Sequence, residues 1–411
     1  MTLWRRLGVG PKEAGQVPAY RIDNQRLTPF DAGFADALAT AYVERLRPLC
    51  LCLAEGVAMY VARLGASFIV KRMPGTGSMH ATDCVSYELP AELSGLAHVI
   101  GSAITENPET GITSLKLGFA MSKNGTRSID FQCGDGADSA IDRGAKLTLR
   151  GLLHYLWDQA ELTRWHPGFA GRRSWATVRR HLYSATEGKI ARGRALHACL
   201  YIPEVFNVER RDELTARRSL RWTHAMPTRD GVRQLMLMVG EVKEIMPTQF
   251  GFNAMIKHVP DQPFALSGRL YESIGRRFEQ ELSLWGACDG LHMVMIATFG
   301  LSDVGIPTIE DLSLMPTSAQ WIPVEDVFEL QLVNRLLRAG RRFSKSLRYD
   351  FPAERDLTAA VLLDTPDRPS PLCIARPGYG SSSIANRGDN GAMPWVWDVG
   401  QTTIPPLPLR A

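Results

Sequence analysis

The stretch from Leu49 to Tyr87 reads LCLCLAEGVAMYVARLGASFIVKRMPGTGSMHATDCVSY, and the rest of the chain is best understood outward from it. Its middle part consists of two alternating apolar runs, VAMYVAR and SFIVKRM, joined at Leu64-Gly65-Ala66. Alternation of this kind on both sides of a short Gly-containing connection predicts a β-hairpin. A hairpin brings the two ends of the stretch together.

Both ends of this stretch carry side chains that bind metals. Cys50 and Cys52 form a C-x-C pair at the first end, and His80 and Cys84 form an H-x3-C pair at the second. If the hairpin folds the second pair back beside the first, three sulfurs and one imidazole meet. That donor set is typical of a closed tetrahedral zinc site, so the sequence predicts structural zinc.

Two other interpretations of these residues stay open at this point. Free cysteines are often small buried hydrophobes, and a C-x-C pair on a strand would point its sulfurs to opposite faces. A turn at Cys50–Cys52 would instead bring both sulfurs to one side. The spacing is shorter than the usual C-x2-4-C of zinc sites. A catalytic zinc would need an open coordination position, which four protein ligands do not leave.

The composition is that of an ordinary globular protein. The chain has 411 residues, 45% of them hydrophobic and 22% charged, with a formal net charge of +4. No apolar run approaches the length of about 18 residues that suggests a membrane span, so no membrane partner is expected. The N-terminus lacks the apolar segment of a secretory signal. Seven scattered cysteines favour reduced thiols and a cytoplasmic location over a disulfide framework.

The pattern along the chain predicts an α+β multidomain protein with a zinc-bound β-hairpin module at its N-terminus. The predicted division is a loose tail (1–18), a zinc-binding α/β module (19–121), a loop or linker (122–142), a basic helical domain (143–225), an α+β domain with a mostly antiparallel sheet (226–320), a small α/β unit (321–376) and a disordered tail (377–411).

The basic helical domain suggests a nucleic-acid partner. Residues 141–225 contain 16 Lys and Arg against 8 Asp and Glu, whereas the whole chain carries only +4. Two helical segments, LRGLLHYLWDQA and the Ser174-capped WATVRRHLYSAT, resemble a helix-turn-helix. We expect DNA phosphates to be contacted by the arginines around the second helix, namely Arg172, Arg173, Arg179 and Arg180. The alternative is a helical bundle whose arginines only face water.

Two short patterns raise the possibility of a nuclease. Glu241-Val242-Lys243 resembles the ExK half of a metal-dependent nuclease site. Such a site needs a second carboxylate, but Asp230 would lie at the far end of the same strand, roughly 36 Å away at about 3.3 Å per residue.

The C-terminal part offers a second, more extended resemblance. A helix bearing Glu329, followed by FSKSLRYD, AAVLLDT and PLCIA, resembles the core of the restriction-endonuclease-like superfamily. The metal-binding carboxylates of that superfamily are missing, because Thr358 and Ala359 precede the middle strand and Cys373–Ala375 occupy the last one. Asp364 is expected to be a turn residue. The resemblance therefore implies a nuclease-like α/β unit without catalysis.

Taken together, LCLC with GVAMYVARLG, FIVKRMPGTGSMH, LRGLLHYLWDQAELTRW, VGEVKE and RRFSKSLRYD are similar to the proteobacterial domain-of-unknown-function family 1173. The resemblance spans roughly residues 20–375. It implies a plasmid or integrating-element context and no reaction. The expected function is a zinc-stabilised, non-enzymatic, DNA-binding accessory protein of a mobile genetic element. The alternatives are a metal-dependent nuclease using Glu241 and Lys243, and a protein-interaction scaffold without nucleic-acid contact.

Overall fold

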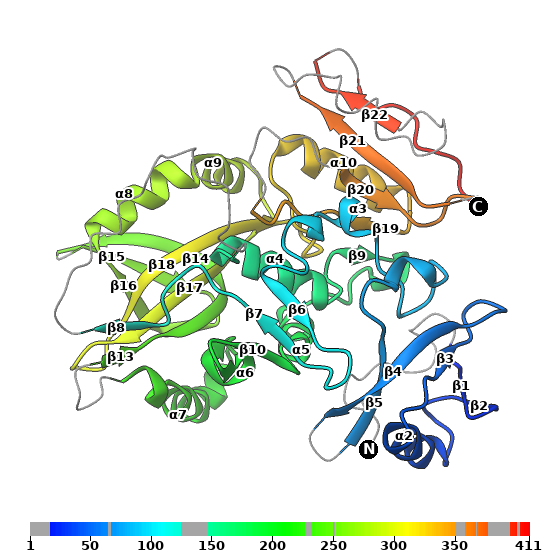
Figure 1. Ribbon diagram of the computed structural model, residues 1–411. Coiled ribbons are helices and arrows are strands. Elements are labelled where there is room, and N and C mark those ends of the chain that lie inside the picture. The colour runs from blue at the N-terminus through cyan, green and yellow to red at the C-terminus, as the bar shows by residue number, and fades with distance from the viewer. Residues whose placement is uncertain are drawn as a thin grey trace.

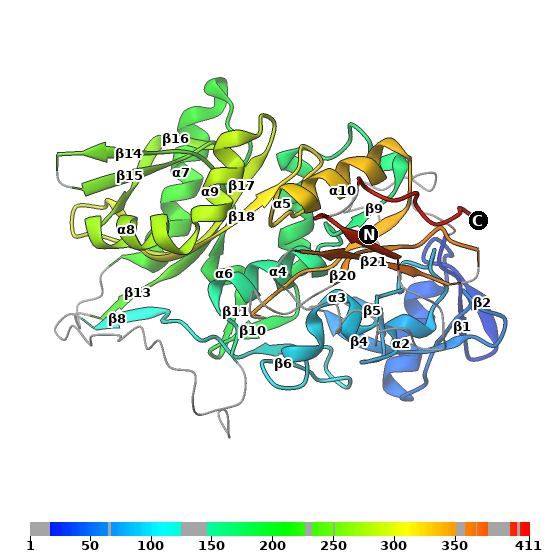
Figure 2. The same cartoon turned by 90° about the horizontal axis from the view of Figure 1, so that it is seen from above.

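The computed structural model describes residues 17–64, 67–124, 146–226, 232–249, 251–350, 358–366, 368–376, 395–400 and 403–411. This part of the chain is a mixed α+β structure with several mainly antiparallel sheets (Figure 1). Figure 1 and Figure 2 agree that the N-terminal sheet and the sheet with the longest strands lie at opposite sides of the molecule, with helix α4 (Leu149–Gln159) between them.

The N-terminal module is a five-stranded sheet in the order β2-β1-β3-β4-β5 with one helix packed on it. Its elements are β1 (Tyr20–Ile22), β2 (Gln25–Leu27), α2 (Phe34–Val43), β3 (Leu49–Cys50), β4 (Val57–Leu64) and β5 (Ser67–Arg72). Strands β4 and β5 pair antiparallel, so the predicted hairpin is confirmed. Gly65 and Ala66 of its connection lie outside the described residues.

A small sheet, β11-β10-β7-β6, ties this module to the middle of the chain. The elements of this region are η1 (Gly77–Met79), α3 (Ala91–Ser94), η2 (Leu96–His98), β6 (Ile104–Glu106), β7 (Thr113–Leu115), β10 (Lys189–Ala191) and β11 (Arg194–Ala195). Strand β7 pairs in parallel with β10, which follows it by some seventy-five residues along the chain (Thr113 opposite Lys189). The predicted α/β module and basic helical region therefore share a sheet.

The basic helical region does not contain a helix-turn-helix. Its elements are α4, β9 (Arg164–Trp165), η3 (Pro167–Phe169), α5 (Trp175–Ala185), α6 (Leu196–Cys199), β12 (Leu200–Tyr201), η4 (Val208–Arg210), α7 (Arg211–Trp222) and η5 (Thr223–Ala225). A strand and a 3-10 turn separate α4 from α5, where a helix-turn-helix has a turn of three or four residues. Helix α4 is buried along nearly its whole length, because its broad apolar stripe packs into the core and its other side is covered by the segment around Tyr349 and Asp350. Ser174 caps α5 as predicted.

Five strands of a six-stranded sheet close into a barrel, and the sixth, β12, pairs with β14 at its edge. The five barrel strands are β14 (Met236–Thr248), β15 (Gly251–Ile256), β16 (Val259–Leu266), β17 (His292–Leu301) and β18 (Pro307–Thr317). Each pairs with the next in the order β14-β15-β16-β18-β17, and β17 pairs back with β14. Helices α8 (Gly268–Arg277) and α9 (Glu279–Ala287) lie between β16 and β17 in the chain. The pairing within this barrel is mostly antiparallel, as the sequence pattern predicted for this part of the chain.

The region predicted as a linker begins with a strand. Residues 122–124 form β8 (Ser122–Asn124), which pairs antiparallel with β13 (Val232–Gln234) at the side of the barrel. The remainder of the predicted linker, residues 125–142, lies outside the described residues, as do residues 1–16 of the predicted tail.

The C-terminal unit is helix α10 (Val327–Arg338) on a five-stranded sheet, β22-β21-β20-β19-β9. Its own strands are β19 (Phe343–Lys345), β20 (Thr358–Leu362), β21 (Ser370–Ala375) and β22 (Trp395–Asp398). Residues 395–398 were expected in a disordered tail but form β22, because Trp397 is buried against the core and β21 supplies a free edge. Residues 377–394 lie outside the described residues.

Candidate functional site

The two cysteine-containing ends of the hairpin stretch meet in the structure. One ligand atom from each of Cys50, Cys52, His80 and Cys84 lies within 4.8 Å of all the others. Cys50 ends strand β3, and a turn then reverses the chain, so that the sulfur of Cys52 reaches the same side. The sulfur of Cys52 lies 3.4 Å from Nδ1 of His80. The four predicted residues therefore form a Cys/His cluster that could hold a metal ion.

The second pair is positioned by a tight path after β5. Residues Gly77–Met79 form η1, and His80 follows directly. A side chain at Gly77 is excluded, because an added Cβ would lie 2.6 Å from the Cβ of Glu88. The N–H of Cys84 donates to the carbonyl of Ala81 at 2.9 Å, which completes a turn and directs its sulfur back to His80. The Pro- and Gly-containing stretch Met73–Gly77 thus brings His80 and Cys84 beside Cys50 and Cys52.

The charge state of the cluster suits a cation. The sulfurs of Cys50 and Cys84 are 3.7 Å apart, and their hydrogen bond lowers the pKa of Cys84 to about 4 while raising that of Cys50. The N–H of Ser86 also donates to the sulfur of Cys84, at 3.3 Å. A buried thiolate among two further sulfurs and an imidazole is the donor chemistry that zinc and other soft or borderline cations take.

The surroundings of the cluster are apolar and closed. Cys50 and Cys84 belong to the hydrophobic core that α2 and the N-terminal sheet share, and His80 is buried. Nε2 of His80 is also buried and has no hydrogen-bond partner among the described residues. Four protein donors in such a setting suit a structural ion better than a catalytic one.

The four arginines expected to contact nucleic acid do not share one surface. Arg173 points inward, donates to the backbone carbonyls of Leu162 and Arg164, and lies over the ring of Trp165. Its burial lowers the pKa of the guanidinium to about 10. Arg172 and Arg180 are exposed.

Arg179 lines a pocket of about 610 Å³ between α5, the segment after β12 and α7. Five arginines line this pocket, together with aromatic rings and two carboxylates: Arg179, Arg211, Arg217, Arg218, Arg221, Tyr183, Tyr201, Phe206, Glu204 and Asp261. Four of the five arginines come from α7. Arg217 and Arg218 precede Arg221 by four and three residues, and Arg211 precedes Arg218 by seven, so these spacings of one or two helical turns put them on neighbouring positions. That spacing in RDELTARRSLRW is the sequence signal for this pocket, and the charge count alone did not find it.

Two of the five pocket arginines are neutralised by carboxylates. Arg218 makes a bidentate pair with Asp261, at 3.0 and 2.6 Å, and both side chains are nearly buried. Arg217 pairs with Glu204 at 2.9 Å and with Glu213 at 2.6 Å. The Arg218–Asp261 pair holds α7 against the barrel, and the Arg217–Glu204 pair ties it to the segment after β12.

The other three pocket arginines have no carboxylate partner among the described residues. Arg179 and Arg221 donate to backbone carbonyls, and both guanidinium groups lie over the ring of Tyr183, at 4.9 and 5.9 Å from its centroid. Nε of Arg221 is buried and unpaired. Arg211 is exposed at the start of α7. Like charges held around one ring repel each other, and an anion in the pocket would relieve that repulsion.

The ExK residues are separated in the structure. The Glu241 carboxylate is buried and accepts hydrogen bonds from Lys257 at 2.9 Å and from His292 at 2.7 Å. Burial would raise its pKa, but these two donors lower it. Lys243 is exposed beyond a bulge in β14 and pairs with Glu244. Asp230 lies outside the described residues.

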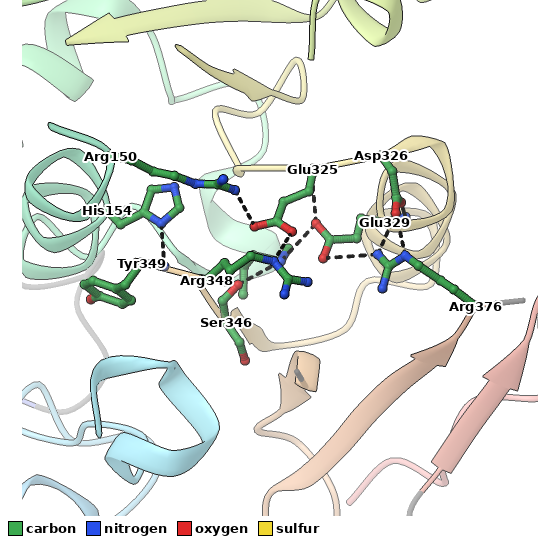
Figure 3. A network of polar contacts seen from close by, with 10 residues as sticks. Arg150, His154, Glu325, Asp326, Glu329, Ser346, Arg348, Tyr349 and Arg376 are labelled. Atoms are coloured by element: carbon green, nitrogen blue, oxygen red, sulfur yellow. Dashed lines mark hydrogen bonds and ion pairs between the residues drawn. The ribbon is translucent and has the colours of Figure 1, made fainter. Parts of the chain in front are cut away.

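Glu329 of the nuclease-like unit belongs to a network of ion pairs (Figure 3). Its carboxylate pairs with Lys345 at 3.1 Å, and both side chains are almost fully buried. Arg376 donates to Asp326 at 2.7 Å, beside Glu329. Figure 3 shows Asp326 and Glu329, at the start of α10, pointing toward Arg376, which directly follows β21.

The same network continues into α4. Glu325 pairs with Arg150 at 3.1 Å and with Arg348 at 2.8 Å. Burial alone would raise the pKa of Glu325, but Arg150 and Arg348 hold it at about 2. Asp364, expected to be a turn residue, instead pairs with the buried Arg341 at 2.9 Å. Glu325, Asp326, Glu329 and Asp364 are thus engaged with the protein's own cations.

Fold and site together define a mixed α+β protein with a Cys/His cluster that could hold a metal ion. The chain belongs to the family described as "Protein of unknown function (DUF1173)", which matches residues 20–400. Comparison with curated proteins and with solved structures found no match. No helix within the described residues is long and apolar enough to cross a membrane.

Proposed function

We propose that this protein is a zinc-stabilised, non-enzymatic, nucleic-acid-binding accessory protein of a mobile genetic element, acting in its maintenance or transfer in the cytoplasm. The observation that carries the binding role is the pocket between α5 and α7, where Arg179, Arg211 and Arg221 have no carboxylate partner within the part of the chain that the structure describes. Phosphates are the anions that such uncompensated arginines favour, because a guanidinium matches phosphate geometry. The mobile-element context comes from the family resemblance.

Zinc is the cation that the Cys/His cluster favours. Three sulfurs and one imidazole make a four-coordinate donor set, and a closed set of this kind stabilises folding without reacting. Cys50, Cys52, His80 and Cys84 would hold the ion. Its chemistry there is the neutralisation of thiolates that the apolar core otherwise isolates.

A metal-dependent nuclease remains the second candidate. It rests on Glu241 and Lys243 and on the nuclease-like order of α10 and strands β19, β20 and β21. The ion pairs around Glu241 and Glu329 favour a structural role for both carboxylates. Incubation of supercoiled plasmid with the protein and Mg²⁺ or Mn²⁺ should leave the plasmid uncut. Cleavage that Glu241→Ala abolishes would replace the proposed function by this one.

A titration against salt tests the binding role. Fluorescence anisotropy of labelled 20-nucleotide DNA, single-stranded and as a duplex, should show binding that weakens steeply between about 50 and 200 mM salt, since phosphate contacts release counterions. Arg211→Ala should reduce the slope of log affinity against log salt by about one. Arg276→Ala, an exposed arginine on α8, should leave it unchanged. Absence of salt-dependent binding to either DNA would favour the scaffold role instead.

A further inference from the structure

The connectivity of the barrel is that of an oligonucleotide-binding fold. Strand β14 pairs antiparallel with both β15 and β17, and β15 pairs antiparallel with β16. Strand β16 pairs in parallel with β18, which closes the ring, and the helical connection α8–α9 falls between the third and fourth strands. A five-stranded Greek-key barrel of this order is the OB-fold, which binds oligonucleotides and oligosaccharides over its second and third strands.

The first strand has the shape that this closure needs. The first half of β14, Met236–Val242, pairs with β17, and the second half pairs with β15. A bulge between Val242 and Glu244 bends the strand at the point of change. The interior is filled by apolar side chains from all five strands. The barrel is therefore a packed scaffold, and ligands must bind outside it.

The basic pocket lies against the hairpin formed by the second and third strands. Two of its lining residues, His258 and Asp261, come from the β15–β16 turn and the start of β16. The N–H of Phe206 donates to Nδ1 of His258 at 3.4 Å, and Arg218 of α7 pairs with Asp261. These two bonds attach opposite walls of the pocket to the β15–β16 hairpin. In OB-folds, the second and third strands, which form this hairpin, carry the binding face.

We propose that this pocket holds the phosphates of single-stranded nucleic acid bound along the β15–β16 side of the barrel. The inference rests on the proposed function and names the form of nucleic acid. A volume of about 610 Å³ is that of a small-molecule site, and a duplex, whose major groove alone is about 12 Å wide, is too broad to enter it.

The lining of the pocket supports the same ligand. Arg179, Arg211 and Arg221 favour a polyanion over a neutral oligosaccharide, because their charges are not compensated by carboxylates. Tyr183 and Phe206 add aromatic surface, on which unpaired bases stack. A duplex hides the faces of its bases, whereas a single strand exposes them.

The test compares single-stranded and duplex DNA with the full-length protein. Anisotropy of fluorescein-labelled dT20 and of a blunt 20-base-pair duplex, at the same salt, should show dT20 binding at least tenfold more tightly. Arg179→Ala and Arg221→Ala should each weaken dT20 binding by about tenfold, the scale of one charge-assisted contact. Arg180→Ala is the matched control, since Arg180 is exposed beside Arg179 but does not line the pocket. It should change affinity by less than about twofold.

Arg211→Ala keeps the test decisive if the other variants fold poorly, because Arg211 is exposed and holds no described element in place. It should also weaken dT20 binding. Duplex binding as tight as dT20 binding, or pocket variants with wild-type affinity for dT20, would overturn this inference and leave the proposed function standing. If neither DNA binds, the proposed function fails and the inference fails with it.

Discussion

The Cys/His cluster and the ion network of α10 both bury polar side chains, but they satisfy them differently. In the α10 network, Glu325, Asp326 and Glu329 face cations from the chain itself, so every carboxylate has a partner. In the Cys/His cluster no lysine or arginine joins the sulfurs among the described contacts. The first arrangement is complete, whereas the second lacks a positive charge.

This difference indicates which of the two clusters depends on something outside the chain. A buried carboxylate with a close cation has part of its desolvation cost offset by Coulomb attraction, although burial still raises the pKa of Glu329. A thiolate in an apolar core has no such offset unless a metal supplies it. The contrast can be tested by removing one member from each cluster.

The largest loss of stability is expected from removing one ligand of the Cys/His cluster. Zinc binding to such sites contributes on the order of 10 kcal/mol or more to folding at neutral pH. Cys84→Ser should therefore abolish metal content and unfold the N-terminal module. Elemental analysis should find about one zinc per wild-type chain and almost none in the variant.

Cys288→Ser is the matched control, because Cys288 lies in another part of the core, away from this cluster. It should retain both zinc and stability. Wild-type protein that is purified without chelators and carries no zinc, or a chelator that leaves the melting temperature unchanged, would contradict the metal-dependent side of the comparison.

A smaller but still large loss is expected from the ion network. Lys345→Met leaves the buried Glu329 carboxylate without its closest cation, and breaking a buried pair in this way typically costs about 3–5 kcal/mol. The measurement is chemical denaturation of wild type and variant at pH 7, with zinc present in both.

A second substitution distinguishes the effect of lost charge balance from the effect of lost packing. Adding Glu329→Leu to Lys345→Met removes the orphaned carboxylate and should recover most of the lost stability. A double variant as unstable as the single one would show that packing, and not charge compensation, explains the effect. Exposed ion pairs such as Arg233–Asp303 should contribute only about 0–1 kcal/mol to the free energy of unfolding.

The same contrast explains what the sequence could and could not predict. The sequence could predict the Cys/His cluster, because a single hairpin between two short motifs brings together Cys50, Cys52, His80 and Cys84. The basic pocket was only half predicted. Arg179 was named, but the pocket also needs α7 and the β15–β16 turn, which lie far apart in the sequence.

Long-range pairing accounts for the other differences too. The sequence suggests that Arg173 is a surface residue like its neighbour Arg172. In the structure its side chain turns inward and donates to backbone carbonyls that come close to it only in the folded chain. The strand at Trp395–Asp398 depends on an edge of β21, and the closure of the barrel depends on β17 returning to β14. Hydrophobic periodicity predicts helices and strands, but it does not predict which distant strand each one pairs with.

A half-buried acid, Asp158, extends the comparison because it forms no ion pair with any of the described residues. It accepts a hydrogen bond from Thr163 at 3.3 Å. The nearby arginines are engaged elsewhere, Arg72 with Glu88 and Arg164 with Glu161. Burial, helped by the negative charge of Glu88, raises the pKa of Asp158 to about 7.

Of the three buried or half-buried sites compared, the smallest change in stability is therefore expected from Asp158→Asn, and this change should depend on pH. The pKa in the folded state is about 7, above the unfolded value of 3.8, so the folded protein holds this proton longer. The resulting stability is complete below about pH 4, is lost as the pH rises to about 7, and stays lost above that. Asparagine does not titrate, so Asp158→Asn should match wild type near pH 4 and exceed it at pH 8. The full shift from 3.8 to about 7 would correspond to about 4 kcal/mol, and solvent screening of the half-buried side chain reduces the expected gain to about 2 kcal/mol. Melting curves at both pH values check this, with the exposed Asp303→Asn as the control that should show no such trend. A stability difference that stays constant from pH 4 to pH 8 would mean that the acid is compensated after all, as Glu325 is.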